Sequence, residues 1–465
     1  MVSPFGTHVY EDAALSVTTS ALQRGATNGG STLATVGRGI ALVCLAVVVL
    51  EVAVSFLPDD VFLSYFTVRR LILLVGLVAL ATVLVLRPEE RRSLPRQALI
   101  LAIPIGLLLI SYLASAFINR SPLGFSSVRL LVEEILVLVL VVLLVRDRRD
   151  AGRVLLILFV AVAAVAFESI RQFTAGENTN YFIVNRDGWT TIEVLRAPED
   201  GFVRVVGYFN NPNVLGAWLM LVLPFAAAFA WRARLSGWVT GVVVVAGAVA
   251  LILTFSRAPL LSIVLALILI ASLWRWKLAL LLIPVVAAVI LNPFSLGRLT
   301  TGISRLDALG IGLRGVAENP LVGVGPGGFR DFALSRGAEF WNAHDSFLNV
   351  AAEVGIVGGL SLLAMVVLAI VWSLRLRTTL PGDPLVSALI VAFVSFALVS
   401  LLDAPYNTVA GSYMLWLLLG LLIASCGFAA AERKSQAPAD GRIRALTGEA
   451  PGQVVKSEWW QVPER

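Results

Sequence analysis

A single histidine gives this chain its clearest candidate for chemistry. His344 lies in the segment 341–348, with the sequence WNAHDSFL, and is one of two histidines among 465 residues. An imidazole has an ordinary pKa of about 6.5, so it can accept a proton near neutral pH and act as a general base. Histidines near a helix start also serve as caps or lie at a membrane interface. The segment therefore has a catalytic and a structural interpretation.

Arginines accompany this histidine. Arg204 precedes the turn-prone segment 207–213, and Arg257 lies in a very short connection between two apolar segments. A guanidinium is permanently charged and presents a planar fork of donors, so it suits a phosphate or diphosphate. Binding of anionic lipid head groups is the alternative. The lipid alternative is favoured for four arginines further along the chain: Arg298, Arg314, Arg330 and Arg336.

Other ionisable groups are few. Glu51, Glu168 and Glu353 lie in or at the ends of apolar segments, where an acid is commonly functional or paired with arginine. His344 has no second histidine or cysteine at metal-ligand spacing, so neither a metal nor another cofactor is expected. The glycine-rich segment 323–328 lacks the Lys and Ser or Thr of a phosphate-binding P-loop and is expected to form a tight turn.

The composition predicts that membrane helices position these residues. Hydrophobic residues make up 58% of the chain, charged residues make up 14%, and the mean hydropathy is +0.88, too apolar for a water-soluble globule. The net charge of +6 is therefore attributed to Lys and Arg residues that set the orientation of the chain in the membrane. No nucleic acid partner is expected. No removable signal peptide is expected. Cys44 and Cys426 lie in apolar runs and are expected to be small apolar fillers.

Hydropathy predicts an all-α integral membrane protein with about twelve spans, each of about 20 mostly apolar residues. An N-terminus inside makes the short connections basic, as the positive-inside rule requires, and leaves both termini cytoplasmic. The expected units are a tail, 1–38, a membrane domain, 39–427, and a disordered tail, 428–465. The spans fall near residues 39–57, 71–87, 98–117, 130–145, 152–170, 213–231, 238–254, 258–273, 278–291, 353–372, 385–402 and 408–427.

Two long connections fall on the outer face in this topology. They cover residues 171–212 and 292–352 and mix aromatic residues, glycine turns and arginines. Loops of this length in a compact fold are usually functional or disordered, and this composition favours function. We expect partly helical lids close to the membrane. A helix is predicted over residues 344–372, starting near the N-cap residue Asn342. The N-terminus of a helix disfavours a cation, so this position would keep the imidazole of His344 neutral.

Four ordered sequence motifs resemble the O-antigen ligase and polymerase family of bacterial membrane glycosyltransferases. The resemblance covers roughly residues 200–372, whereas the earlier spans match only in hydropathy. The order and placement of the motifs carry the resemblance, because each motif alone is weak. The motifs are GYFNNPN at 207–213 with Pro224 later in the span, TFSRA at 254–258, NPLVGVGPGGF at 319–329, and HDSFL at 344–348 followed by EVGIVG at 353–358.

The resemblance implies a GT-C-like fold in the bacterial cell membrane and a metal-independent, inverting glycosyl transfer at its outer face. The donor would be a glycan linked to a polyprenyl diphosphate, and the acceptor a lipid, a glycan or a protein. By motif, Arg204 and Arg257 would bind the donor diphosphate, and His344 would be the base toward the acceptor hydroxyl. Arg305 would be a further binding arginine. Asp345 departs from the family, where asparagine commonly follows the histidine.

Two other function classes fit the same hydropathy. A small-solute or anion transporter would usually place ionisable groups near the middle of the bilayer. The candidates here lie mainly at the outer rim, which favours chemistry at the membrane surface. A peptidoglycan-type polymerase would rely on an outer-face aspartate. Within the glycosyltransferase class, the sequence leaves ligase, polymerase and protein glycosylation open.

Overall fold

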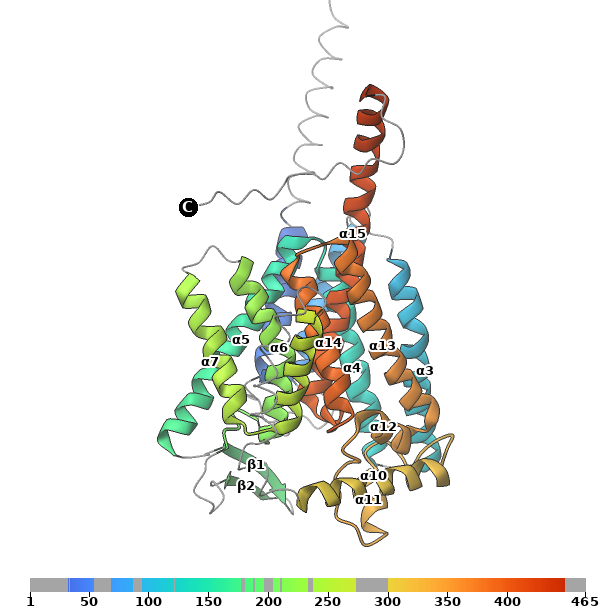
Figure 1. Cartoon of the computed structure of the whole chain (residues 1–465). Coiled ribbons are helices and arrows are strands. Elements are labelled where there is room, and N and C mark those ends of the chain that lie inside the picture. Colours follow the sequence, from blue (N-terminus) through green and yellow to red (C-terminus); the bar gives the residue numbers. More distant parts are fainter. Residues whose placement is uncertain are drawn as a thin grey trace, which may run out of the picture.

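A computed structural model gives the fold of the protein, and it is mainly helical (Figure 1). The structure describes residues 32, 34–53, 68–86, 94–120, 122–176, 180–186, 189–195, 204–209, 211–232, 237–272 and 300–447.

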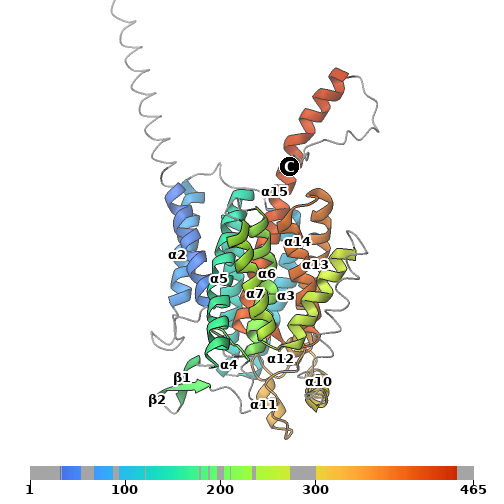
Figure 2. The same ribbon diagram turned by 60° about the vertical axis from the view of Figure 1, so that its left-hand side comes forward.

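The larger part of the described chain is a bundle of roughly aligned helices (Figures 1 and 2). These helices are Ala34–Ala53, α2 (Val68–Leu86), α3 (Arg96–Asn119), α4 (Pro122–Leu144), α5 (Arg148–Ala175), α6 (Pro212–Arg232), α7 (Gly237–Leu253), Arg257–Ser272, α13 (Ile356–Thr379), α14 (Pro384–Ser400) and α15 (Val409–Thr447). Shorter elements are α10 (Thr300–Glu318), α11 (Phe329–Leu334), α12 (Ser346–Val354) and the 3-10 helix η2 (Pro405–Asn407).

The helical membrane character expected from the sequence is confirmed. Six described helices are long and apolar enough to cross a membrane, and three shorter apolar helices accompany them. Each predicted span except the ninth overlaps a described helix. The ninth, 278–291, lies outside the described residues, so the count of twelve stays a prediction.

The two long connections lie at the same end of the bundle, here called the loop end (Figure 1). The first contains an antiparallel hairpin of β1 (Asn180–Arg186) and β2 (Trp189–Leu195), which was not predicted. Residues 196–203 of this connection lie outside the described residues, so a partly helical lid stays a prediction. The second contains α10, α11 and α12 and is largely helical, as expected. The protruding part of α15 lies at the opposite end, where it continues as a helix to Thr447 beyond the predicted boundary of a disordered tail.

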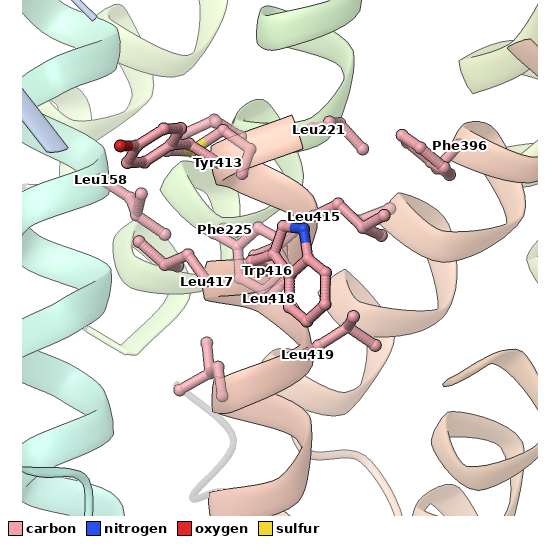
Figure 3. Close-up of a cluster of buried hydrophobic side chains, with 14 of the residues drawn as sticks. Leu158, Leu221, Phe225, Phe396, Tyr413, Leu415, Trp416, Leu417, Leu418 and Leu419 are labelled. Carbon is pink, nitrogen blue, oxygen red and sulfur yellow. The ribbon is translucent and has the colours of Figure 1, made fainter. Parts of the chain in front are cut away.

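The core forms around α15, whose first half is apolar on every side. Trp416 and Leu417 are fully buried there, and they pack among side chains from α5, α6 and α14, including Phe225 and Phe396 (Figure 3). A helix that is hydrophobic all round must be enclosed by others. Because α15 is held inside the bundle, the short connection between α14 and α15 has a defined position. This connection lies at the loop end.

Acids within the bundle are held by partners. Glu51 accepts two hydrogen bonds from Arg69, one of them 2.6 Å long. Glu133 pairs with Arg70 and accepts a hydrogen bond of 2.8 Å from the Tyr413 hydroxyl. A buried charge is costly unless it is paired and hydrogen-bonded, so these pairs give both acids a structural role.

Candidate active site

A pocket of about 270 Å³ opens at the loop end of the bundle, and His344 lines it. Its walls come from segments far apart in sequence: the start of α6, the segment 339–344, and the α14 to α15 connection. The other lining residues are Asn211, Asn213, Val214, Ala217, Pro259, Glu339, Phe340, Trp341, Asn342, Val399, Asp403, Ala404, Pro405 and Thr408.

His344 precedes α12 and is not part of a helix, so the predicted continuous helix 344–372 is wrong. Asp345 is the N-cap, and its side chain accepts a hydrogen bond of 2.7 Å from the Leu348 N–H. The backbone of His344 is left-handed, with φ of 51°. Its N–H donates to Asn342 Oδ1 over 2.9 Å, which stabilises the turn. A second break occurs at Gly355, so α12 and α13 are separate helices.

Asp403 is the principal partner of this histidine. Its Oδ1 lies 3.4 Å from Nδ1 of His344, at the long end of hydrogen-bond distances. Burial alone would raise the pKa of Asp403, but hydrogen bonds from His344 and the Ala404 N–H, with the charges of His344 and Arg305, lower it below its ordinary value. The carboxylate is therefore ionised at neutral pH and can orient an imidazole through Nδ1.

Asp403 was not predicted as a site residue, although its position in the sequence resembles that of Arg257. Both are charged residues in a very short connection between two apolar segments. In such a connection, a side chain cannot lie far from the ends of the helices that flank it. The same reasoning, applied to the last two spans, would have placed Asp403 at the bundle end. Its pairing with His344 depends on the tertiary fold.

Arg204 joins the site through Asn213. Its Nη2 donates to Asn213 Oδ1 over 3.0 Å, and its Nε donates to the Thr254 carbonyl over 2.9 Å. Asn213 in turn donates from Nδ2 to Asp403 Oδ2 over 3.3 Å. A chain of polar contacts therefore connects Arg204, through Asn213 and Asp403, to His344.

Arg257 and Arg305 lie next to this chain of contacts. Ser256, the residue before Arg257, donates to Asn213 Oδ1 over 2.9 Å, and Arg257 itself is half-buried at a helix start. Arg305 Nη1 donates to the Leu402 carbonyl over 2.9 Å, directly before Asp403. The three arginines singled out from the motifs thus lie on segments that meet around one pocket.

The remaining arginines occupy other positions. The Arg330 guanidinium stacks on Trp341 at 3.6 Å from the ring centroid, and Arg336 lies over Phe332 and pairs with Glu318. Arg314 faces a second groove on the same end of the molecule. Arg298 lies outside the described residues.

A buried glutamine holds the loop that carries Arg204. Gln172, on α5, has no exposed surface, and its Oε1 accepts from the N–H groups of Val206 and Gly207, each over 3.0 Å. Its Nε2 donates to the Gly207 carbonyl over 2.6 Å. Gly207 has φ of 56°, a left-handed conformation that favours glycine. Gln172 therefore supplies backbone partners where the chain enters this turn.

Replacing Gln172 with leucine is expected to weaken binding of an anionic ligand at Arg204. Leucine has similar size but leaves buried backbone groups of the loop unpaired, at a cost of about 1–3 kcal/mol each. We expect Gln172→Leu to bind a polyprenyl diphosphate about tenfold more weakly than the wild type, measured by titration of the purified protein. The matched control is Thr174→Ala, an exposed change near the end of the same helix. Unchanged affinity in Gln172→Leu would contradict the positioning role.

Glu353 organises the glycine-rich turn. Its carboxylate accepts a hydrogen bond from the Gly327 N–H over 3.0 Å, and its carbonyl accepts one from the Gly325 N–H over 3.0 Å. A Cβ on Gly323 would lie 2.3 Å from the Glu353 carbonyl, so the two backbones meet closely. The turn expected from the sequence therefore packs its backbone against the end of α12.

The pKa of Glu353 gives the fold a pH dependence. Burial raises it from 4.5 to about 7, against the lowering effect of hydrogen bonds from Gly327 and neighbouring groups. As the pH rises, Glu353 ionises at a lower pH in the unfolded chain than in the folded protein. The free energy of unfolding is therefore unaffected by this group below its unfolded pKa, and it falls by at most about 3 kcal/mol as the pH rises through its folded pKa. We expect the unfolding temperature to fall between pH 5 and pH 8 and Glu353→Gln to reduce this fall. An equal fall in both proteins would contradict this assignment.

Among the residues that the structure describes, no group of three or more histidine, cysteine, aspartate or glutamate side chains has the arrangement of a metal site. The polar side chains that line the pocket are three asparagines, a threonine, the imidazole of His344 and the carboxylates of Glu339 and Asp403. No protein-family profile matches the sequence, and a search of curated proteins found no similar one.

Proposed function

We propose that the protein is a membrane glycosyltransferase that moves a glycan from a polyprenyl diphosphate to an acceptor hydroxyl. One observation carries the proposal: His344 and its partner Asp403 line a pocket, and the segments that carry Arg204, Arg257 and Arg305 contact residues in or next to its lining. A proton acceptor and a set of guanidinium groups at the end of an apolar bundle suit a diphosphate leaving group attached to a lipid. The reaction would take place at the extracytoplasmic face of the bacterial cell membrane.

The geometry supports a single displacement. Asp403 would hold the Nδ1–H of His344, leaving Nε2 to accept the proton of the acceptor hydroxyl. The acceptor oxygen would bond to the anomeric carbon as the bond from that carbon to the diphosphate oxygen breaks, with inversion. The arginines would stabilise the charge on the departing diphosphate, which stays attached to its lipid.

Transport is the second candidate, and one observation favours it. The bundle buries Glu134 on α4 with its Oε1 making no hydrogen bond to any described residue, and ionisable groups within membrane helices commonly mark a pathway. Uptake of radiolabelled anions into vesicles that contain the purified protein would test this candidate. Transport that depends on Glu134 and not on His344 would favour it over glycosyl transfer.

A genetic experiment tests the proposal in the cell. In a strain without the chromosomal copy, a plasmid carrying the wild-type protein should restore the missing surface glycan. A plasmid with both His344→Ala and Arg257→Ala should not restore it, although the protein reaches the membrane in equal amount. Arg336→Ala is the control, since this arginine pairs with Glu318 and lies over Phe332, neither of which lines the pocket. Full restoration by the double variant would overturn the enzyme assignment.

Arg257→Lys separates the shape of the cation from its charge. Lysine keeps the positive charge but lacks the planar fork that binds two phosphate oxygens. We expect kcat/KM for the lipid-linked donor to fall by about 10- to 100-fold, as for the loss of charged hydrogen bonds worth about 1.5–3 kcal/mol. Initial rates over a range of donor concentrations would measure this. Wild-type kinetics in the lysine variant would contradict a diphosphate contact at Arg257.

A further inference from the structure

A second groove adjoins the pocket of His344. It has a volume of about 500 Å³ and lies between α10 and the segment 337–340. Glu339 and Phe340 line both hollows, so the two share a wall. Figure 1 shows α10 lying across the bundle at its loop end. The first pocket, by contrast, is lined by residues at the start of α6, which belongs to the bundle. The groove is therefore farther from the apolar bundle than the proposed lipid diphosphate site.

The side chains around the groove match a hydroxyl-rich ligand. Asp307, Arg314 and Glu339 bring two carboxylates and one guanidinium, all on exposed residues, and Phe340 adds an aromatic ring. Carboxylates accept, and guanidinium groups donate, the paired hydrogen bonds that vicinal hydroxyls offer. The volume is within the range of about 300–1,000 Å³ typical of ligand pockets.

An exposed tryptophan extends the aromatic part of this surface. Trp341 is 71% exposed and lines the first pocket directly after Phe340. The Arg330 guanidinium lies over its ring at 3.6 Å from the centroid, which holds one face and restricts the rotation of the side chain. Aromatic rings offer flat apolar surfaces, and sugar rings have a matching apolar face of C–H groups. The pair of aromatic residues thus forms the border between the two hollows.

The charge of the groove lining bears on which ligand it accepts. Two carboxylates and one guanidinium give this lining a net charge of −1. At the first pocket, Arg204 donates to the lining residue Asn213, and Arg305 donates to the Leu402 carbonyl next to Asp403. A carboxylated or phosphorylated sugar would meet like charges at Asp307 and Glu339, and such contacts reject a ligand. A neutral or amino-bearing sugar would not.

We propose that this groove binds the acceptor glycan, and that it selects neutral or amino sugars over anionic ones. The assignment of the bound glycan as acceptor rests on the proposed glycosyl transfer, because His344 lies beyond the shared Glu339 and Phe340 wall. Sugar binding itself does not depend on catalysis, so the groove can be tested separately.

Gly310 allows the groove to be blocked. It lines the groove on α10, and a Cβ added to it would meet no atom within 4 Å. Gly310→Trp would therefore fill the groove without pushing on the protein at its Cβ. Gly310→Ala is the matched control, since it adds one methyl group at the same position.

The test uses fluorescent hexasaccharides of glucose, glucosamine and galacturonic acid, titrated against the full chain in lipid nanodiscs. We expect saturable binding of the neutral or the amino probe, at least tenfold tighter than that of the anionic probe. Gly310→Trp should weaken this binding at least tenfold, and Gly310→Ala less than twofold. The proposal is overturned if no probe saturates, if the anionic probe binds most tightly, or if Gly310→Trp binds like the wild type.

A parallel titration keeps the two proposals distinguishable. Polyprenyl diphosphate is titrated into the same nanodiscs, and Gly310→Trp should bind it as the wild type does. If the wild type binds the sugar probe and not the polyprenyl diphosphate, the donor assignment fails and the sugar groove stands. If it binds polyprenyl diphosphate alone, the groove assignment fails and the proposed donor site stands.

Discussion

His344→Ala is expected to lower the rate of glycosyl transfer by about 10²- to 10⁴-fold, the usual contribution of a general base. Alanine removes the imidazole that would accept the proton of the acceptor hydroxyl. Donor binding should stay close to that of the wild type, because Arg204 and Arg305 lie on other segments and make no hydrogen bond to His344 in the contacts described. The measurement is kcat with purified protein at saturating donor, together with a separate titration of donor affinity.

The split between rate and affinity is the informative part of this experiment. The left-handed backbone at His344 is stabilised by Asn342, so alanine at this position could disturb the turn. His344→Asn keeps a polar side chain that tolerates this conformation and controls for such a disturbance. Both variants should lose kcat. Wild-type kcat in either variant would show that His344 is not the base.

Asp403→Asn is expected to lower kcat by about 10²- to 10⁴-fold, by analogy with other carboxylates that orient a catalytic histidine. The amide can donate to Nδ1, which would place the ring hydrogen on Nε2, where the acceptor proton must go. The shape of the side chain is conserved, and with the amide nitrogen at the Oδ1 position the amide oxygen can still accept from Asn213 Nδ2, whereas the Ala404 N–H loses its acceptor. Initial rates and donor affinity would again be measured separately.

The two variants together discriminate between bases. If Asp403 accepted the proton directly, as the peptidoglycan-type alternative requires, His344→Ala would keep substantial activity and Asp403→Asn would not. If the two residues act as one unit, the double variant should be no slower than His344→Ala alone, since effects within such a unit are not additive. Independent losses that multiply would contradict the pairing of His344 with Asp403.

Much of the helical architecture could be predicted from hydropathy, because a membrane helix satisfies its own backbone and requires a long apolar run. The positions of Arg204, Arg257 and His344 near one end of the bundle also followed from topology. Local motifs could not reveal the contact of Asn213 with Asp403, which connects segments 190 residues apart in sequence.

Each wrong prediction has a physical cause. The segment after His344 has helical composition throughout, yet Asp345 caps one helix and Gly355, with φ of 88°, ends it. A Cβ at Gly355 would lie 2.1 Å from the Leu321 carbonyl, so the break depends on a distant backbone. The hairpin of the first long connection was missed although the sequence carries a signal for it. The strand sequences NYFIVNR and WTTIEVL are rich in aromatic and β-branched residues, and Asp187-Gly188, a pair typical of tight hairpin turns, separates them.

Glycosyl transfer by the purified protein is the most direct test of the central claim. The protein in nanodiscs is given a radiolabelled glycan on polyprenyl diphosphate with an envelope extract as acceptor, and free polyprenyl diphosphate and labelled product are both measured. We predict equal amounts of the two with the wild type and neither above background with His344→Ala. Release of lipid diphosphate without glycosylated product, or equal product from the alanine variant, would contradict a transferase that uses His344 as its base.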